Sequence, residues 1–288
     1  MNAGPPPIDN VRRSFVEARG VRFHVTESGP PDGRPVVALH GWPQHHWAYR
    51  DLLAEPPAGL RVIAPDLPGY GWSGPAPHKW GKEDVANDVL ALLDELRLER
   101  VLLVGHDWGG YVGHLLVLGA PERIEGYLAL NISHPWQTPR TLLPHLWRFL
   151  LYQPPVAAFG VTVQRYTPYI EWVIFGIGSK LDGQTARVYA ERFRDPVCAR
   201  AARDTYRSLW MHEIPSGARH PETRRSTVPT RALFGVGDIA LHRSLAAPET
   251  ANADDYTLET VDCSHFIIDE RPELVRARLI TLADETHS

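Results

Sequence analysis

The 288-residue sequence contains only two cysteines, Cys198 and Cys263. Two cysteines cannot form a disulfide framework, and their separation matches no metal-ligand spacing. We therefore expect a reducing, cytoplasmic location and no metal site. Long apolar runs are also missing, since stretches such as Trp172–Ile177 are far shorter than the roughly 20 residues that span a bilayer. The polar, proline-rich tail at residues 1–10 lacks the basic start and apolar stretch of a signal peptide.

An excess of positive charge is absent as well. The chain has 30 basic and 34 acidic side chains, a formal net charge of −4, which argues against a nucleic-acid or anionic-membrane partner. Hydrophobic residues make up 43% and charged residues 22%, as in ordinary globular proteins, so disorder, collagen-like repeats and coiled coils are excluded. The length fits either two domains or one large α/β domain.

Strand-like and helix-like segments alternate from residue 11 onward. Val11–Glu17 and Val21–Glu27 have the pattern of a β-hairpin. The later segments are, in chain order, strands at Val36–Leu39 and Arg61–Ala64, a helix at Glu83–Leu96, a strand at Val101–Val104, a helix at Trp108–Gly119, strands at Tyr127–Leu130, Arg231–Phe234 and Tyr256–Val261, and a helix from Pro272 to Leu282. This alternation predicts an α/β fold with a mostly parallel sheet flanked by helices.

The pattern is interrupted in the middle of the chain. Residues 135–215 show no strand signal, have helical spacing and hold 13 of the 27 aromatic residues. The polar, turn-rich stretch that follows, Ser216–Pro229, resembles a linker. We therefore predict an α/β core at 11–134 and 216–288 that carries an inserted helical cap at 135–215, with an apolar cleft between them.

The most informative stretch is VLLVGHDWGG at 101–110, where a strand signal leads directly into a helix signal. Small residues around Asp107 permit a tight, strained turn, the geometry that presents a catalytic nucleophile at the strand-to-helix junction. The usual occupant of that position is serine, and here it is Asp107. The alternative interpretation is structural, because aspartate is also a good helix N-cap.

A nucleophile on such a turn needs an orienting acid and a histidine base later in the chain. Asp238 follows the strand Arg231–Phe234, and His265 follows the strand Tyr256–Val261. Both positions lie at the predicted carboxyl edge of the sheet, where sites of open α/β sheets form. We therefore predict that Asp107, Asp238 and His265 form a catalytic triad.

Two loops complete the predicted site. The segment LHGWP at 39–43 places the Trp42 N–H where it can form an oxyanion hole with the Trp108 N–H, and its Trp42-Pro43 bond is a candidate cis peptide. The Gly-rich segment PDLPGYGWS at 65–73 fits neither nucleotide-binding fingerprint, and neither does the turn at 105–110. We therefore expect no cofactor.

These segments resemble one known family. HGWP, PDLPGYGWS, VGHDWGG, GVGD and DCSHFIIDERP, in this order and spacing, are similar to the motifs of soluble epoxide hydrolases with the α/β-hydrolase fold. The resemblance implies that Asp107 attacks an epoxide to form an ester, that His265, oriented by Asp238, activates the water that hydrolyses this ester, and that a vicinal diol is released. It also implies that two cap tyrosines protonate the epoxide oxygen. Tyr152 in LLYQPP and Tyr206 in DTYRSLW match the family's sequence contexts best among the cap tyrosines, and packing is the alternative role for both.

Two other functions remain open. A haloalkane or haloacid dehalogenase uses the same Asp-His-Asp logic, but the haloalkane type usually has asparagine at the position of Trp42, and the fluoroacetate type arginine at that of Trp108. A non-catalytic ligand-binding protein is the other alternative. The expected partners are water and a small apolar or aromatic epoxide, with no nucleic acid and no membrane, and the oligomeric state is not predicted.

Overall fold

The computed structural model describes residues 4–78, 81–248 and 250–287, so residues 1–3 of the predicted tail lie outside the described residues. Eight strands form one sheet in the order β1-β2-β4-β3-β5-β6-β7-β8. The strands are β1 (Arg12–Ala18), β2 (Val21–Ser28), β3 (Arg34–Leu39), β4 (Leu60–Pro65), β5 (Val101–His106), β6 (Ile124–Leu130), β7 (Thr230–Gly235) and β8 (Tyr256–Val261). The first two form the predicted hairpin and pair antiparallel, β2 also pairs antiparallel with β4, and all remaining pairs are parallel.

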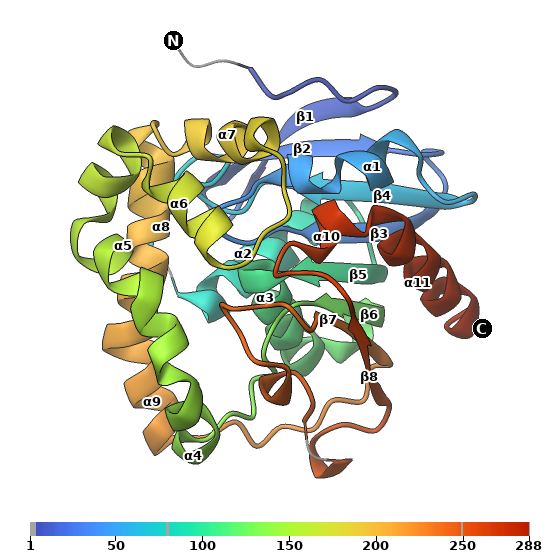
Figure 1. Ribbon diagram of the computed structural model, residues 1–288. Coiled ribbons are helices and arrows are strands. Elements are labelled where there is room, and N and C mark those ends of the chain that lie inside the picture. The colour runs from blue at the N-terminus through green and yellow to red at the C-terminus, as the bar shows by residue number, and fades with distance from the viewer. Residues whose placement is uncertain (1–3, 79–80, 249, 288) are drawn as a thin grey trace.

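Helices cover both faces of this sheet (Figure 1). The core helices are α1 (Arg50–Ala54), α2 (Lys82–Glu95), α3 (Asp107–Gly119), α10 (Ile267–Glu270) and α11 (Pro272–Glu285). Helices α2 and α3 pack on each other, α3 contacts β5 and β6, and α1 contacts α11. The predicted α/β fold with a mostly parallel sheet is therefore confirmed.

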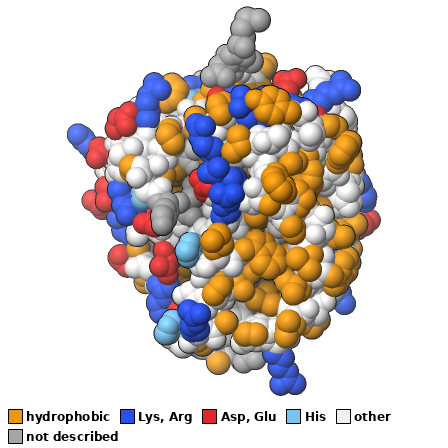
Figure 2. All heavy atoms as spheres, turned by 90° about the vertical axis from the view of Figure 1, so that its left-hand side faces the viewer, with side chains coloured by type: hydrophobic (Ala, Val, Ile, Leu, Met, Phe, Trp, Pro, Cys, Tyr) orange, Lys and Arg blue, Asp and Glu red, His pale blue; other side chains and the backbone are white. Residues whose placement is uncertain are grey.

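Between β6 and β7 the described chain forms helices and loops and adds no strand to the sheet. These inserted helices are α4 (Pro139–Leu142), α5 (Leu146–Tyr166), α6 (Tyr169–Gly176), α7 (Gly183–Arg192), α8 (Pro196–Ser208) and α9 (Ile214–Arg219). Helix α9 continues into residues 216–219, where the sequence pattern had indicated a linker. Figure 2 shows the side of the molecule formed by these helices, where hydrophobic side chains gather over a broad area. Within the described ranges, no helix, the long α5 included, combines the length and apolarity needed to cross a bilayer.

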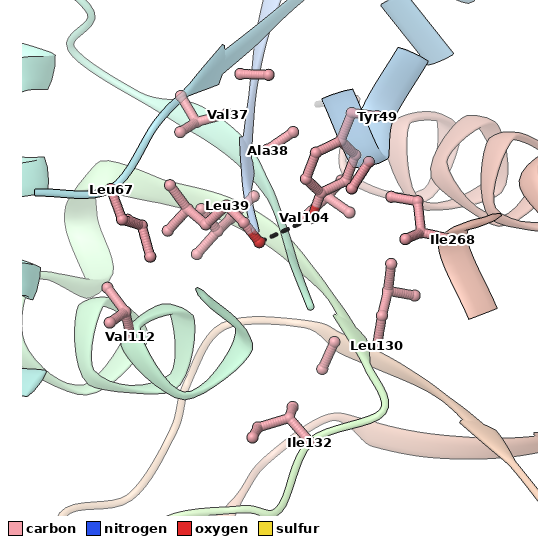
Figure 3. Close-up of a cluster of buried hydrophobic side chains, with 14 of the residues drawn as sticks. Val37, Ala38, Leu39, Tyr49, Leu67, Val104, Val112, Leu130, Ile132 and Ile268 are labelled. Carbon is pink, nitrogen blue, oxygen red and sulfur yellow. Dashed lines mark hydrogen bonds between the residues drawn. The ribbon is translucent and has the colours of Figure 1, made fainter. Parts of the chain in front are cut away.

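The core lies where β3, β5 and β6 are buried on both faces. Val37, Leu39, Val104 and Leu130 are each at most 1% exposed, as expected for the continuous apolar runs of central parallel strands. The Tyr49 hydroxyl donates a 2.8 Å hydrogen bond to the Leu39 carbonyl oxygen inside this cluster (Figure 3). This bond satisfies a buried polar group at the carboxyl end of β3, immediately before the LHGWP loop.

Candidate active site

Asp107 stands on the turn between β5 and α3. Its φ of 49° lies in the left-handed region, which few residues other than glycine adopt but which aspartate and asparagine tolerate best. Gly109 allows the start of α3 to lie close against the end of β3, since a Cβ at this residue would lie 2.3 Å from the Leu39 carbonyl oxygen. The strained turn predicted from VGHDWGG is therefore present, and it holds the Asp107 side chain at the carboxyl edge of the sheet.

Main-chain N–H groups hold the Asp107 carboxylate. The Trp42 N–H donates a 2.8 Å hydrogen bond to Asp107 Oδ2, and the Trp108 N–H also bonds the carboxylate. The Trp42-Pro43 peptide bond is cis. The two donors predicted for an oxyanion hole thus meet at one carboxyl group, so an ester at Asp107 would keep an acyl oxygen within their reach.

His265 lies between the two carboxylates. Its Nδ1 is 2.8 Å from Asp238 Oδ2, and its Nε2 is 3.8 Å from Asp107 Oδ1. The second distance is too long for a direct hydrogen bond, but one water can bridge it. The topology explains this meeting, because β5, β7 and β8 all run parallel and end at the same edge of the sheet.

Burial and mutual charge set the proton affinities of this group. Burial raises the pKa of Asp107 to about 6, against the opposing effects of His265 and the two N–H donors. Burial disfavours the imidazolium of His265, but the Asp238 carboxylate and, to a smaller extent, Asp107 outweigh this and raise its pKa to about 9. The site therefore favours a negative Asp107 beside a positive His265 between these two values.

Asn131, which the sequence analysis missed, positions Asp238. Its Nδ2 donates a 2.8 Å hydrogen bond to Asp238 Oδ2, the oxygen that also faces His265. The Leu241 N–H donates to the other oxygen, Oδ1, at 2.9 Å. Asn131 follows β6 directly and has a φ of 42°. Its place at the carboxyl end of a predicted strand was the signal that could have identified it.

Two inserted helices bring the predicted tyrosines to the site. Tyr152 on α5 and Tyr206 on α8 are 9% and 1% exposed. Their ring centroids lie 6.0 and 5.4 Å from that of Trp42 and 6.1 Å from each other. Burial is the main cause that raises the pKa of both well above the ordinary value, so both hydroxyls keep their protons at neutral pH.

The Tyr152 hydroxyl is held by Gln153 and also interacts with the side chain of Tyr206. Gln153 Nε2 donates a 3.1 Å hydrogen bond to the Tyr152 oxygen, which uses the hydroxyl as an acceptor and leaves its proton for another partner. The Trp210 indole N–H holds the Gln153 amide through a 3.0 Å hydrogen bond to Oε1. Together with the contacts of Asp107, His265 and Trp42 described above, these interactions place the seven residues predicted for the site in one cluster: Trp42, Asp107, Trp108, Tyr152, Tyr206, Asp238 and His265.

The two tryptophans differ in their indole N–H groups. Trp42 Nε1 donates a 3.0 Å hydrogen bond to Gln164 Oε1 on α5, whereas the buried Trp108 side chain interacts with the Tyr206 hydroxyl. Lys82, for which the sequence offered no signal, has its ammonium 4.3 Å from the Trp108 ring centroid and 2.5 Å from Glu213 Oε2. Lys82 therefore supports the Trp108 ring and ties α2 to the inserted helices.

One buried group of potential metal ligands occurs among the described residues, formed by His24, His46 and Asp66. The Asp66 carboxylate already accepts hydrogen bonds from the His24 and His46 rings and from the N–H groups of His46 and Trp72, at 2.7 to 2.9 Å. Four donors satisfy both oxygens, so Asp66 serves as a structural anchor for the PDLPGYGWS loop.

The comparisons with known proteins agree with this architecture. The sequence is 28% identical over 287 residues to the AB hydrolase superfamily protein YfhM of Bacillus subtilis, covering 95% of this chain and 98% of that protein. It is 25% identical over 291 residues to human Epoxide hydrolase 4, covering 94% and 78%. It is also 26% identical over 276 residues to Haloalkane dehalogenase 2 of Mycobacterium bovis, covering 93% of each.

The solved structure of the epoxide hydrolase CorEH without ligand has a TM-score of 0.76 to this chain, with 23% identity over 96% of this chain and 99% of that one. At 23% identity, this structural similarity shows only that the two proteins share a fold. The family described as having the alpha/beta hydrolase fold matches residues 34–272, from β3 to the start of α11. The protein therefore belongs to the α/β-hydrolase fold family.

Proposed function

We propose that this hydrolase is an epoxide hydrolase that converts a small apolar or aromatic epoxide to a vicinal diol. An Asp107 carboxylate oxygen attacks an epoxide carbon, and the bond between that carbon and the epoxide oxygen breaks. The leaving oxygen takes its proton from Tyr206 or Tyr152. The product is an ester between Asp107 and the opened substrate.

The ester is then hydrolysed. His265 Nε2 removes a proton from a water whose oxygen attacks the Asp107 carboxyl carbon, and Asp238 stabilises the resulting imidazolium. The N–H groups of Trp42 and Trp108 stabilise the oxyanion, a contribution of about 2.7–4 kcal/mol for each donor. Collapse breaks the acyl–oxygen bond, and the diol oxygen takes the proton back from His265. The Asp107 carboxylic acid formed in this step then gives its proton to the tyrosinate left by the first step, which restores both side chains.

The observation that carries this proposal is that a carboxylate, rather than a hydroxyl, occupies the strained turn beside a His-Asp pair and two protonated tyrosines. A serine that opened an epoxide would form an ether, which water does not readily cleave, whereas a carboxylate forms a hydrolysable ester. We further propose that residues 135–215 act as a cap that supplies the proton donors, while the core supplies Asp107, Asp238 and His265.

A haloalkane dehalogenase is the second candidate, because the buried Trp108 indole N–H, which lies beside the Tyr206 hydroxyl, is a donor that a halide can accept. A halide site needs a second donor, however, and the Trp42 indole N–H is already bound to Gln164. The two tyrosines near Asp107 have no task in halide displacement, since a halide leaves without a proton. These contacts favour an epoxide as the substrate.

Product analysis tests the proposal directly. The protein is incubated with an aryl epoxide and, separately, with a haloalkane of similar size, and diol and halide are measured. We expect diol from the epoxide at a rate well above the uncatalysed reaction. Halide release without any diol would establish the dehalogenase instead, and turnover of neither substrate would favour the ligand-binding protein.

The two half-reactions should respond differently to pH. Ester formation needs ionised Asp107, so its rate should fall as the pH drops through about 6. Ester hydrolysis needs neutral His265, whose pKa is raised to about 9 in the free protein, so its rate should rise with pH. Esterification removes the Asp107 charge and hence part of this raising effect, so the hydrolysis rate should level off below pH 9.

Stopped-flow tryptophan fluorescence separates these steps, because Trp42 and Trp108 border the reacting carboxyl group. With excess protein, the fast phase reports ester formation and the slow phase its hydrolysis. If the rate of the fast phase falls as the pH is raised, or the rate of the slow phase is higher at acidic pH, the roles assigned to Asp107 and His265 are contradicted.

Gly41 leaves the space that Asp107 occupies. A Cβ at residue 41 would lie 2.3 Å from Asp107 Oδ2 and 2.5 Å from its Cβ, so Gly41→Ala should displace the nucleophile by about 1 Å and lower kcat at least 100-fold, as such misplacements do. Gly119→Ala is the matched control, because the nearest atom to a Cβ there is 4.0 Å away. Steady-state kinetics should show normal kcat for the control, and equal loss in both variants would refute the steric explanation.

A further inference from the structure

The outward face of α5 is apolar. Leu143, Trp147, Leu150 and Leu151 are 66%, 52%, 52% and 60% exposed. Leu143 lies in the turn immediately before α5, and the spacing of three and four residues puts all four on one side of the helix. Pro154 and Ala158 are exposed as well and continue the same row. These six residues are called the α5 stripe.

The inward face of α5 is the more polar one. It buries Tyr152, Gln153 and Gln164 together with Val156 and Gly160, and Gln164 accepts the Trp42 indole N–H in the candidate active site. A surface helix normally turns its apolar side inward. Here large apolar side chains also lie in water, at a cost of about 25 cal/mol for each Å², which indicates that the stripe is covered by a partner.

None of the six residues of the stripe is charged, although the Arg148 guanidinium lies 4.9 Å from the Trp147 ring centroid and the Arg207 guanidinium donates to the Ala158 carbonyl oxygen. Arg148 is the one charged residue from 143 to 164, and its guanidinium points to the core, where it donates to the carbonyl oxygens of Asp238, Ile239 and Leu241 at 3.1, 2.8 and 3.3 Å. Depletion of charge with enrichment of aromatic and large aliphatic residues is typical of the centre of a protein interface. A helix that lies on a lipid surface would instead carry many lysines and arginines along its polar face.

The exposed area fits a subunit interface. If a large side chain offers roughly 200 Å², the four exposed fractions correspond to about 450 Å² of apolar surface. A standard interface covers about 800 Å² on each partner, and about 65% of it is apolar in homodimers. The stripe therefore supplies most of the apolar area that such an interface has on each partner, and Figure 2 shows further hydrophobic side chains gathered on this side of the molecule.

We propose that the α5 stripe is a homodimer interface, in which two copies of this chain pack α5 against α5 about a twofold axis. A twofold contact uses the same patch on both subunits, and an uncharged apolar stripe is self-complementary without any charge matching. In an antiparallel crossing, Leu150 and Leu151 of both copies meet near the axis. Because Tyr152 and Gln153 lie on the opposite face of the same turns, the dimer would also fix the inner surface of α5.

Sedimentation velocity tests this proposal without reference to any activity. Since interfaces of standard size bind with micromolar or higher affinity, the wild type at about 50 μM should sediment as a dimer. The double variant Leu150→Glu/Leu151→Glu brings four like charges to the axis and should raise the dissociation constant at least 100-fold. Ile280→Glu, at an apolar residue of α11 that is 38% exposed, is the matched control and should remain a dimer.

A second variant gives a readout that does not depend on disrupting the fold. Leu151→Cys should form a disulfide-linked dimer under mild oxidation, and Ile280→Cys should not. A monomeric wild type, or a dimer unaffected by the two glutamates, would overturn the proposal. A monomer that binds vesicles of phosphatidylserine and phosphatidylcholine through Leu150 and Leu151 would also overturn it, with a lipid surface as the partner.

Discussion

Replacing Asp107 by asparagine is expected to lower diol formation by about 10⁴-fold or more, because loss of a covalent nucleophile leaves only binding and the oxyanion hole. Asparagine keeps the shape of the side chain and tolerates the φ of 49° at this turn. The fold should therefore persist, and the loss should appear in kcat. Steady-state kinetics with the aryl epoxide measure this, and thermal unfolding checks the fold.

The Asp107→Asn variant should also change the pKa of His265. Removal of the Asp107 charge takes away one of the causes that raise the pKa of His265, so this pKa should fall below about 9. NMR titration of the histidine ring protons can follow it. Near-normal turnover by Asp107→Asn would exclude Asp107 as the nucleophile, and an unchanged His265 pKa would contradict the 3.8 Å juxtaposition of the two side chains.

Replacing His265 by glutamine should stop the reaction half-way. Asp107 can still open the epoxide, since an ionised carboxylate needs no base, but no group remains to activate the hydrolytic water. We expect steady-state turnover to fall by about 10³-fold or more, while an adduct with the full mass of the epoxide accumulates on the protein. Intact-protein mass spectrometry after mixing should show this adduct in stoichiometric amount.

A control variant separates this effect from a general one. His212→Gln changes an exposed histidine of the inserted segment and should turn over normally without accumulating an adduct. If the His265→Gln variant accumulates no adduct and also forms no diol, His265 acts in the first step, and the division of labour proposed for the two half-reactions is wrong.

The sequence predicted the core and the candidate triad because both depend on local signals. Buried parallel strands are short apolar runs, and a turn that needs small residues at fixed positions leaves a motif such as VGHDWGG. Since every parallel strand ends at the same edge, the residues after each strand can be expected to meet. Asp238 and His265 were placed by this argument, which applies equally to Asn131.

The sequence predicted that residues 135–215 form helices, but it could not predict which face of each helix points inward. Helix α5 contains Pro154 and Pro155 and leaves helical geometry at Phe159, features that normally indicate a helix end. Its apolar face points outward, so the usual inference from periodicity would have buried the wrong side. Contacts that depend on this orientation, such as Trp42 with Gln164 and Tyr152 with Gln153, become visible only in three dimensions.

The central claim is that Asp107 forms a covalent ester, and a single turnover in H₂¹⁸O with excess protein tests it most directly. If the ester forms, the diol takes its new oxygen from Asp107 and stays unlabelled, while ¹⁸O from water enters the Asp107 carboxyl group and is found there by peptide mass spectrometry. Labelled diol together with an unlabelled Asp107 peptide would show that water attacks the epoxide directly and would contradict the account.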